Sequence, residues 1–141
     1  MLKWADINED SKSKKVYDIS LTQDRLINGL IRRIDKNQHY LLDGHYCLLD
    51  KDNNIRKIPY TTFEKINPIS LHIILGKVSE IKSRLELRDS HFYDSSLLED
   101  MQNEELSYAQ ELSNHLSVNS SIGSAKDSND IIAVLRKILM K

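Results

Sequence analysis

The chain has 141 residues, of which 40% are hydrophobic and 29% are charged, and its formal net charge at pH 7 is −1. These proportions are typical of a single globular domain that is long enough to bury a core. The near-zero charge excludes nucleic-acid binding by bulk electrostatic attraction, and a lone Cys47 excludes an internal disulfide and a cysteine-based zinc site.

Residues 1–18 show no sustained hydrophobic periodicity, so we predict a flexible N-terminal arm. The arm lacks the apolar run of a secretory signal, and no segment approaches the roughly 18 apolar residues of a membrane span, so a cytoplasmic location is expected. Trp4 and Ile7 are candidate partner-binding residues, because an aromatic side chain beside acids is typical of a linear docking motif. Alternatively, Trp4 folds back and covers this protein's own core.

A helix is expected to begin at Ser20, because Ser20 and Gln23 have the spacing of a capping box. Aliphatic residues from Leu26 to Ile34 share one face of this helix. Basic residues line the opposite side at Arg25, Arg32 and Lys36. Such a stripe either binds phosphates or is simply a solvated face.

The segment DKDNNIRKIPYT resembles the start of a calcium loop, with Asp50, Asp52 and Asn54 at the first, third and fifth positions. The sixth position requires glycine but holds Ile55, and the twelfth requires glutamate but holds Thr61. The loop therefore lacks both its sharp turn and its strongest ligand. Calcium binding is not expected.

A small three-stranded antiparallel meander explains the same region better. Asp43 and Gly44 are typical of a two-residue hairpin turn, which would place Leu42 opposite His45. Residues 50–54 would form a second turn. The third strand would end near Pro59, which lacks an amide proton for strand pairing.

Two further helices are predicted to form a hairpin. The dipeptide Asn67-Pro68 indicates a helix start, and apolar residues at 3-4 spacing predict one helix as far as about Arg88. The second helix is expected from about Ser96, again with a capping box, to Leu116. The first of these helices is mainly basic and the second acidic.

The C-terminal part is predicted to be a flexible linker, 117–127, followed by an amphipathic helix, 128–141. A helix of this length is marginal alone, so it must dock on the core domain, 19–116, or on a partner. Its apolar stripe supplies the other candidate partner-binding residues, namely Ile131, Ile132, Leu135, Ile138 and Leu139.

The predicted fold class is therefore α+β, mainly helical with about four helices and the meander inserted after the first. Catalytic and metal-binding motifs are absent from the sequence, so we expect no enzyme, no cofactor and no small-molecule substrate. The group Asp89, His91 and Asp94 is the one candidate for acid–base chemistry, and a polar turn explains it as well.

Two functions remain open. Because several apolar stripes exist without a catalytic constellation, the favoured interpretation is a small adaptor or regulatory subunit that contacts a protein partner or forms a homo-oligomer. The alternative is a nucleic-acid-binding regulator in which the side chain of Tyr40, Tyr46 or Tyr60 stacks on bases. Its phosphate-binding patch would comprise Arg25, Arg32, Arg33, Lys36, Arg56 and Lys57.

Overall fold

The computed structural model describes residues 19–140. In this range the chain forms five helices and four short strands, in the order α1 (Ile19–Arg33), β1 (Cys47–Leu49), β2 (Ile55–Lys57), α2 (Tyr60–Ile66), β3 (Ser70–Leu75), α3 (Val78–Asp89), α4 (Ser95–Leu116), β4 (Asn119–Ser124) and α5 (Asn129–Leu139). Strands β1 and β2 pair antiparallel, and β3 and β4 pair parallel. The α+β class is confirmed, with five helices instead of about four. No described helix is both long and apolar enough to cross a bilayer.

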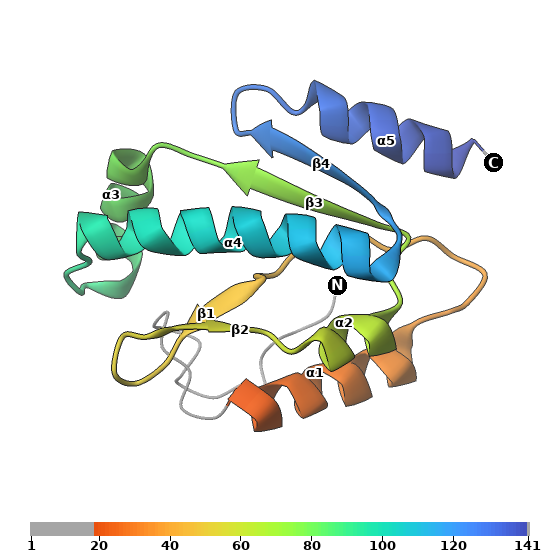
Figure 1. Cartoon of the computed structure of the whole chain (residues 1–141), viewed down its shortest axis with the longest axis horizontal. Helices are drawn as coiled ribbons and strands as arrows, with labels where there is room; N and C mark the ends of the chain where they lie inside the picture. The colour runs from red at the N-terminus through yellow and green to blue at the C-terminus, as the bar shows by residue number, and fades with distance from the viewer. Residues whose placement is uncertain (1–18, 141) are drawn as a thin grey trace.

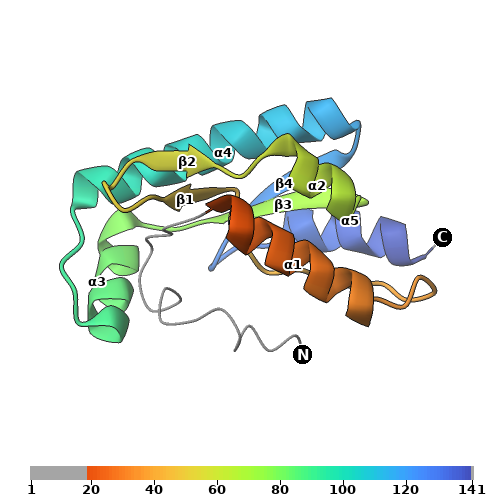
Figure 2. The same ribbon diagram turned by 90° about the horizontal axis from the view of Figure 1, so that it is seen from below.

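Helix α4 is the central element of the molecule (Figure 1). It packs against all four strands and against α3, while α1 packs against α2. Helices α4 and α5 lie on opposite sides of the β3–β4 sheet (Figure 2). The same arrangement follows from the register, because side chains of a strand alternate between the two faces of its sheet.

The main core lies where α4 meets β1, β2, α2 and β3. Its buried residues are Cys47, Ile58, Phe63, Leu71, Tyr108 and Leu112. The Tyr108 hydroxyl donates a hydrogen bond to the Ile58 carbonyl, so this large aromatic side chain satisfies its polar end inside the core. A second cluster of Leu85, Tyr93 and Leu98 joins α3 to α4, so these two helices pack against each other.

Helix α4 owes its position to a regular apolar stripe and to its caps. Its buried side chains, which lie on one face of the helix, are Leu98, Met101, Tyr108, Ala109 and Leu112. The cap is Asp94, whose carboxylate accepts a hydrogen bond from the Ser96 amide, and not Ser96 itself as the capping-box spacing predicted. Ser117, in the left-handed conformation, ends the helix.

The prediction of a three-stranded meander was wrong. Residues 39–45 form no strand, and the hairpin consists only of β1 and β2. Gly44 does not have a positive φ, so Asp43 and Gly44 do not form the expected tight turn. The turn that does form is the second one, where Asn53 has a φ of 62°.

The prediction of one helix from Asn67 to Arg88 was also wrong. Asn67 is the left-handed residue that ends α2, and Pro68 follows it, so the dipeptide marks a helix end here. Residues Ser70–Leu75 form β3, and α3 begins only at Val78. The partner of β3 is β4, which occupies most of the segment that we expected to be a flexible linker.

Candidate interaction surface

Helix α5 docks on the β3–β4 sheet through a close contact between Ile131 and Gly123. Ile131 is buried, and a Cβ atom built on Gly123 would lie 2.8 Å from the Ile131 Cδ1 atom. Only glycine therefore allows this approach without displacement. The docking in cis that the sequence left open is observed, at least for the first turn of the helix.

A tight connection fixes where α5 begins. The Ser124 amide donates to the Asp127 carbonyl at 2.7 Å, and the Asp127 amide donates back to the Ser124 carbonyl at 3.2 Å. The Asp127 carboxylate then accepts from the Asn129 amide at 3.1 Å. Ser128 occupies the cap position but its side chain makes no capping bond, so Asp127 has the role that the sequence assigned to Ser128.

The apolar stripe of α5 is wider than the surface that covers it. Leu135 and Ile138 are half-buried, whereas Ile132 is 41% exposed and Leu139 is 61% exposed. On the same face of the sheet, Ile74 of β3 pairs with Gly123 and is 65% exposed. We call Ile74, Ile132 and Leu139 the α5 surface. Of these, Ile74 was missed by the sequence analysis, which placed it inside a helix.

A chain of polar side chains lies on this face of the sheet. The two ring nitrogens of His72 are hydrogen-bonded to hydroxyl groups, Nδ1 to Ser121 at 2.6 Å and Nε2 to Ser70 at 2.8 Å. Burial lowers the pKa of His72, so the neutral imidazole is favoured. In addition, the Tyr46 hydroxyl donates to the His72 carbonyl at 2.7 Å, and burial raises the pKa of Tyr46 to about 12.

The His72 group has the distances of a nucleophile and a base but not the chemistry of a triad. A catalytic histidine is normally oriented by a carboxylate, which also stabilises the imidazolium that forms. Here the second nitrogen of His72 meets the hydroxyl of Ser70 instead. The arrangement joins β3 to β4 across the sheet, and a role in holding the two strands together explains it.

The six candidate cations divide into two groups. Arg56 forms an ion pair with Asp50 at 2.9 Å, and Lys57 forms one with Glu111 at 3.6 Å and lies over the Tyr108 ring. By contrast, the cations of α1 and of the residues just after it are exposed, and no described residue forms an ion pair with them. These are Arg25, Arg32, Arg33 and Lys36. Two of the six are therefore paired within the protein, and the other four form no ion pair with a described residue.

Two of the three tyrosines expected to stack on bases are occupied. Tyr46 stacks on Phe63 with ring centroids 5.8 Å apart, and Tyr60 stacks on His115 at 4.5 Å. Tyr40 is exposed, but its hydroxyl accepts a hydrogen bond from the Asp35 amide at 2.9 Å. A continuous stacking platform is not formed by these three residues.

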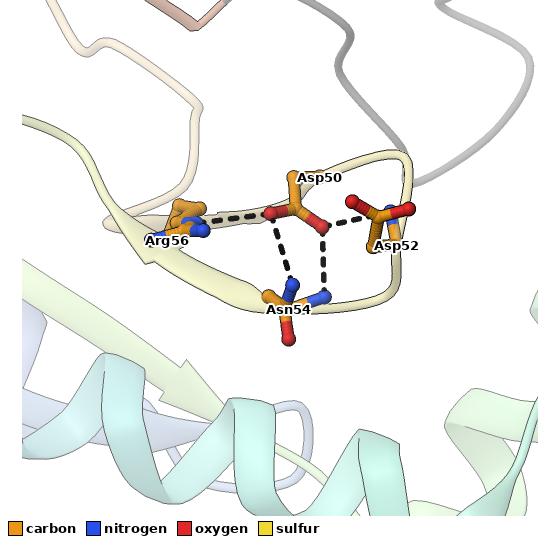
Figure 3. Close-up of polar contacts among 4 residues, drawn as sticks. All are labelled: Asp50, Asp52, Asn54 and Arg56. Carbon is orange, nitrogen blue, oxygen red and sulfur yellow. Dashed lines mark hydrogen bonds and ion pairs between the residues drawn. The ribbon is translucent and has the colours of Figure 1, made fainter.

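The calcium-like loop is closed by its own donors (Figure 3). The Asp50 carboxylate accepts from the amides of Asn54 and Asp52 at 2.9 Å each, from the Asn54 side chain at 3.3 Å and from Arg56 at 2.9 Å. These bonds, led by that of the Asn54 amide, lower the pKa of Asp50 to about 2. The carboxylate therefore organises the hairpin turn. Across residues 19–140, no group of three or more potential metal ligands is found.

The group in the loop before α4 is likewise structural. The Asp89 carboxylate pairs with Arg88 and accepts a hydrogen bond from the Tyr93 hydroxyl at 2.5 Å, and Asp94 caps α4. The His91 ring packs edge-on against Tyr93. Both carboxylates thus make hydrogen bonds within this turn.

Trp4 and Ile7 lie outside the described residues, so their predicted role stays a prediction. Comparison of the chain with models of known families, with curated proteins and with solved structures finds no match. The function is therefore inferred from the surfaces described above.

Proposed function

We propose that the chain is a small adaptor or regulatory subunit that acts through protein–protein contacts. The observation that carries the proposal is the α5 surface, where Ile132 and Leu139 remain exposed on a helix that is already docked through Ile131. Exposed aliphatic residues on a docked helix, rimmed by charged ones such as Arg136 and Lys137, are typical of an interface core with a polar rim.

The sheet beside α5 supports the same proposal. Strand β4 pairs only with β3 among the described strands, so its outer main-chain groups remain unpaired by strands. Such an edge accepts an extended segment of a partner through main-chain hydrogen bonds. Parallel sheets are normally covered on both faces, and here the α5 face leaves Ile74 exposed.

The test compares capture of partners by the full chain and by surface variants. Ile132→Glu and Ile74→Glu place a charge in the proposed interface and should abolish capture from cells, because a buried unpaired charge is strongly unfavourable. The matched control is Leu87→Glu on α3, where the side chain is 87% exposed, and this variant should capture as the unmodified chain does.

Light scattering distinguishes the two kinds of partner. A homo-oligomer would show a mass that falls to that of the monomer in the Ile132→Glu variant. A monomeric chain that loses a captured protein in the same variant would indicate a different partner. If the unmodified chain is monomeric and its captured proteins are the same in all three variants, the proposal is wrong.

Nucleic-acid binding is the second candidate, and the observation in its favour is that the exposed cations of α1 form no ion pair with a described residue. Against it, Arg56, Lys57, Tyr46 and Tyr60 are held by other groups of the protein. Filter binding across a range of salt concentrations tests it, because contacts to phosphates predict an affinity that falls steeply with salt.

A further inference from the structure

One end of the molecule combines exposed aliphatic residues with exposed cations that form no ion pair within residues 19–140. The C-terminal end of α1, the first part of the loop 34–46 and the C-terminal end of α5 lie at this end in both views (Figures 1 and 2). The later part of the loop returns toward β1, and α3 and the β1–β2 turn lie at the other end (Figures 1 and 2). Leu41 is 78% exposed and Ile31 is 73% exposed. The other exposed apolar residues of these segments are Ile34, Tyr40, Leu42, Leu139 and Met140. We call this set with its cations the basic apolar end.

The cations of this end have no ion-pair partner among residues 19–140. Exposed basic residues occur in all three segments, and no described residue forms an ion pair with them; they are Arg32, Arg33, Lys36, Arg136 and Lys137. The acids of the loop after α1 are Asp35 and Asp43, and Asp130 lies in the first turn of α5. The Asp35 carboxylate accepts a hydrogen bond from the Asn37 amide at 2.9 Å, so it shapes the turn after α1.

The loop that presents Leu41 is held in a defined shape. The Asp35 amide donates to the Tyr40 hydroxyl at 2.9 Å, and the Gln38 amide donates to the Asp35 carbonyl at 3.1 Å. These bonds fold residues 35–40 back on themselves. Leu41 and Leu42 follow directly, outside any sheet or core cluster of the described chain, and both remain in contact with water. Two adjacent exposed leucines are an unfavourable arrangement that a ligand surface would relieve.

We propose that the basic apolar end binds an anionic lipid surface. Leu41 and Ile31 would enter the boundary between headgroups and acyl chains, and Arg32, Arg33 and Lys36 would contact the phosphates. Peripheral proteins combine these two features, because apolar insertion and attraction to anionic headgroups add to each other. The binding is on the surface of the bilayer and does not involve the α5 residue Ile132 or the β3 residue Ile74.

A lipid surface fits the observations better than a nucleic acid does. Both offer phosphates to the cations. A nucleic acid, however, offers exposed leucines little apolar surface, namely the methyl groups of thymine and the faces of its bases. Of the aromatic side chains that could stack on bases, Tyr46 already stacks on Phe63 and Tyr60 on His115. The bilayer uses the cations and the leucines together.

The experiment is co-sedimentation of the full chain with vesicles. Vesicles of phosphatidylcholine and phosphatidylserine should sediment the protein, and vesicles of phosphatidylcholine alone should not, at low salt. Arg32→Gln with Arg33→Gln should weaken binding to the mixed vesicles about 30-fold, since each basic residue near an anionic surface contributes roughly fivefold. Leu41→Asp with Leu42→Asp should weaken it at least as much.

Matched controls carry the same changes at the other end of the molecule. Leu87→Asp on α3 should leave vesicle binding unchanged, and so should Lys51→Gln with Arg84→Gln, since Lys51 in the β1–β2 turn and Arg84 on α3 are exposed. All these positions are on the surface, and circular dichroism verifies that each variant is folded.

Three results would overturn the proposal. The first is equal sedimentation with both kinds of vesicle, or with neither. The second is a loss of vesicle binding in the control variants that is as large as the loss in the test variants. The third is binding that requires Arg32 and Arg33 but not Leu41 and Leu42 and that double-stranded DNA or RNA displaces, which would assign the cations to a nucleic acid.

Discussion

Each face of the β3–β4 sheet is covered by an amphipathic helix, but the side chains on the α4 face are buried more completely than those on the α5 face. On the α4 side, Leu71 and Ile73 of β3 are buried, and Leu112 of α4 is fully buried. On the α5 side, Ile131 is buried while Ile74 remains exposed. Helix α4 meets apolar side chains from several strands, whereas the residues that β4 turns toward α5 are Ser121 and Gly123, because its one large apolar residue, Ile122, is in register with Ile73 on the α4 side. An amphipathic helix is therefore buried only as far as the opposite surface allows.

The largest difference between the faces should appear when a leucine is truncated. Leu112→Ala should lower the free energy of unfolding by about 3 kcal/mol, because it opens a cavity where the side chain is completely enclosed. Urea denaturation measures it. Leu87→Ala on α3 is the control, and its exposed side chain predicts a change within about 0.5 kcal/mol. Equal losses in the two variants would contradict the complete enclosure of the Leu112 side chain.

The next largest effect concerns the contact between α5 and the β3–β4 sheet. Gly123→Ala should cost about 2 kcal/mol, because the new methyl group overlaps Ile131 and lies 3.2 Å from the Asp127 carbonyl oxygen. Hydrogen exchange should accelerate in α5 more than in α4. Gly29→Ala is the matched control, because no heavy atom lies within 4 Å of the Cβ position in α1. It should stabilise the helix by about 0.5–1 kcal/mol. Unchanged exchange in α5 would contradict the close contact.

A smaller effect concerns the polar chain on the α5 face. Ser121→Ala removes the hydrogen-bond partner of the His72 Nδ1 atom and should lower the free energy of unfolding by about 1 kcal/mol. Ser120→Ala, on the opposite face of β4, should have less effect because Ser120 is exposed. Chemical denaturation of both variants tests the difference. A larger loss for Ser120→Ala would place the polar chain on the wrong face.

The smallest effect is a dependence on pH that arises from the same histidine. Burial lowers the pKa of His72, so the unfolded chain binds this proton at a higher pH than the folded chain does. Stability should therefore fall as the pH drops below about 6.5, the ordinary value for histidine. The His72→Gln variant should lose less stability over that range. Denaturation curves at several pH values would show it, and parallel curves for the two proteins would contradict it.

Some elements of the fold are predictable from local sequence signals alone. The last two helices, α4 and α5, follow from apolar residues three and four positions apart, and the turn at residues 50–54 follows from its Asp and Asn residues. Their boundaries shifted by a residue or two, because capping side chains compete. Asp94 and Asp127 provide the polar contacts at the two starts, where the sequence analysis favoured Ser96 and Ser128.

The β3–β4 sheet could not be predicted in this way. Strand β3, SLHIIL, has apolar residues compatible with a helix or a strand, and only its partner decides between them. That partner, β4, is composed mostly of serine, asparagine and glycine, which are typical of a loop. The parallel pairing joins segments on either side of α3 and α4, so no local signal reveals it. One long-range contact therefore accounts for both the false helix and the false linker.

The candidate surfaces were predictable only in part. The stripe of α5 and the cations of α1 follow from periodicity, and the structure then shows which of these residues remain exposed. Leu41 and Leu42 were assigned to a strand of a hairpin, and their exposure follows from the absence of that strand. The pairing of Arg56 with Asp50 and of Lys57 with Glu111 depends on the hairpin register and on α4, which the sequence does not specify.

The fully enclosed position of Cys47 has a practical consequence. Its sulfur lies in the main core where β1 meets α4, and burial raises the pKa of the thiol to about 12. A thiol reagent can react there only after the strand has moved away from the helix. The rate at which Cys47 of the natural chain is alkylated therefore reports how often this opening occurs, and no label has to be introduced.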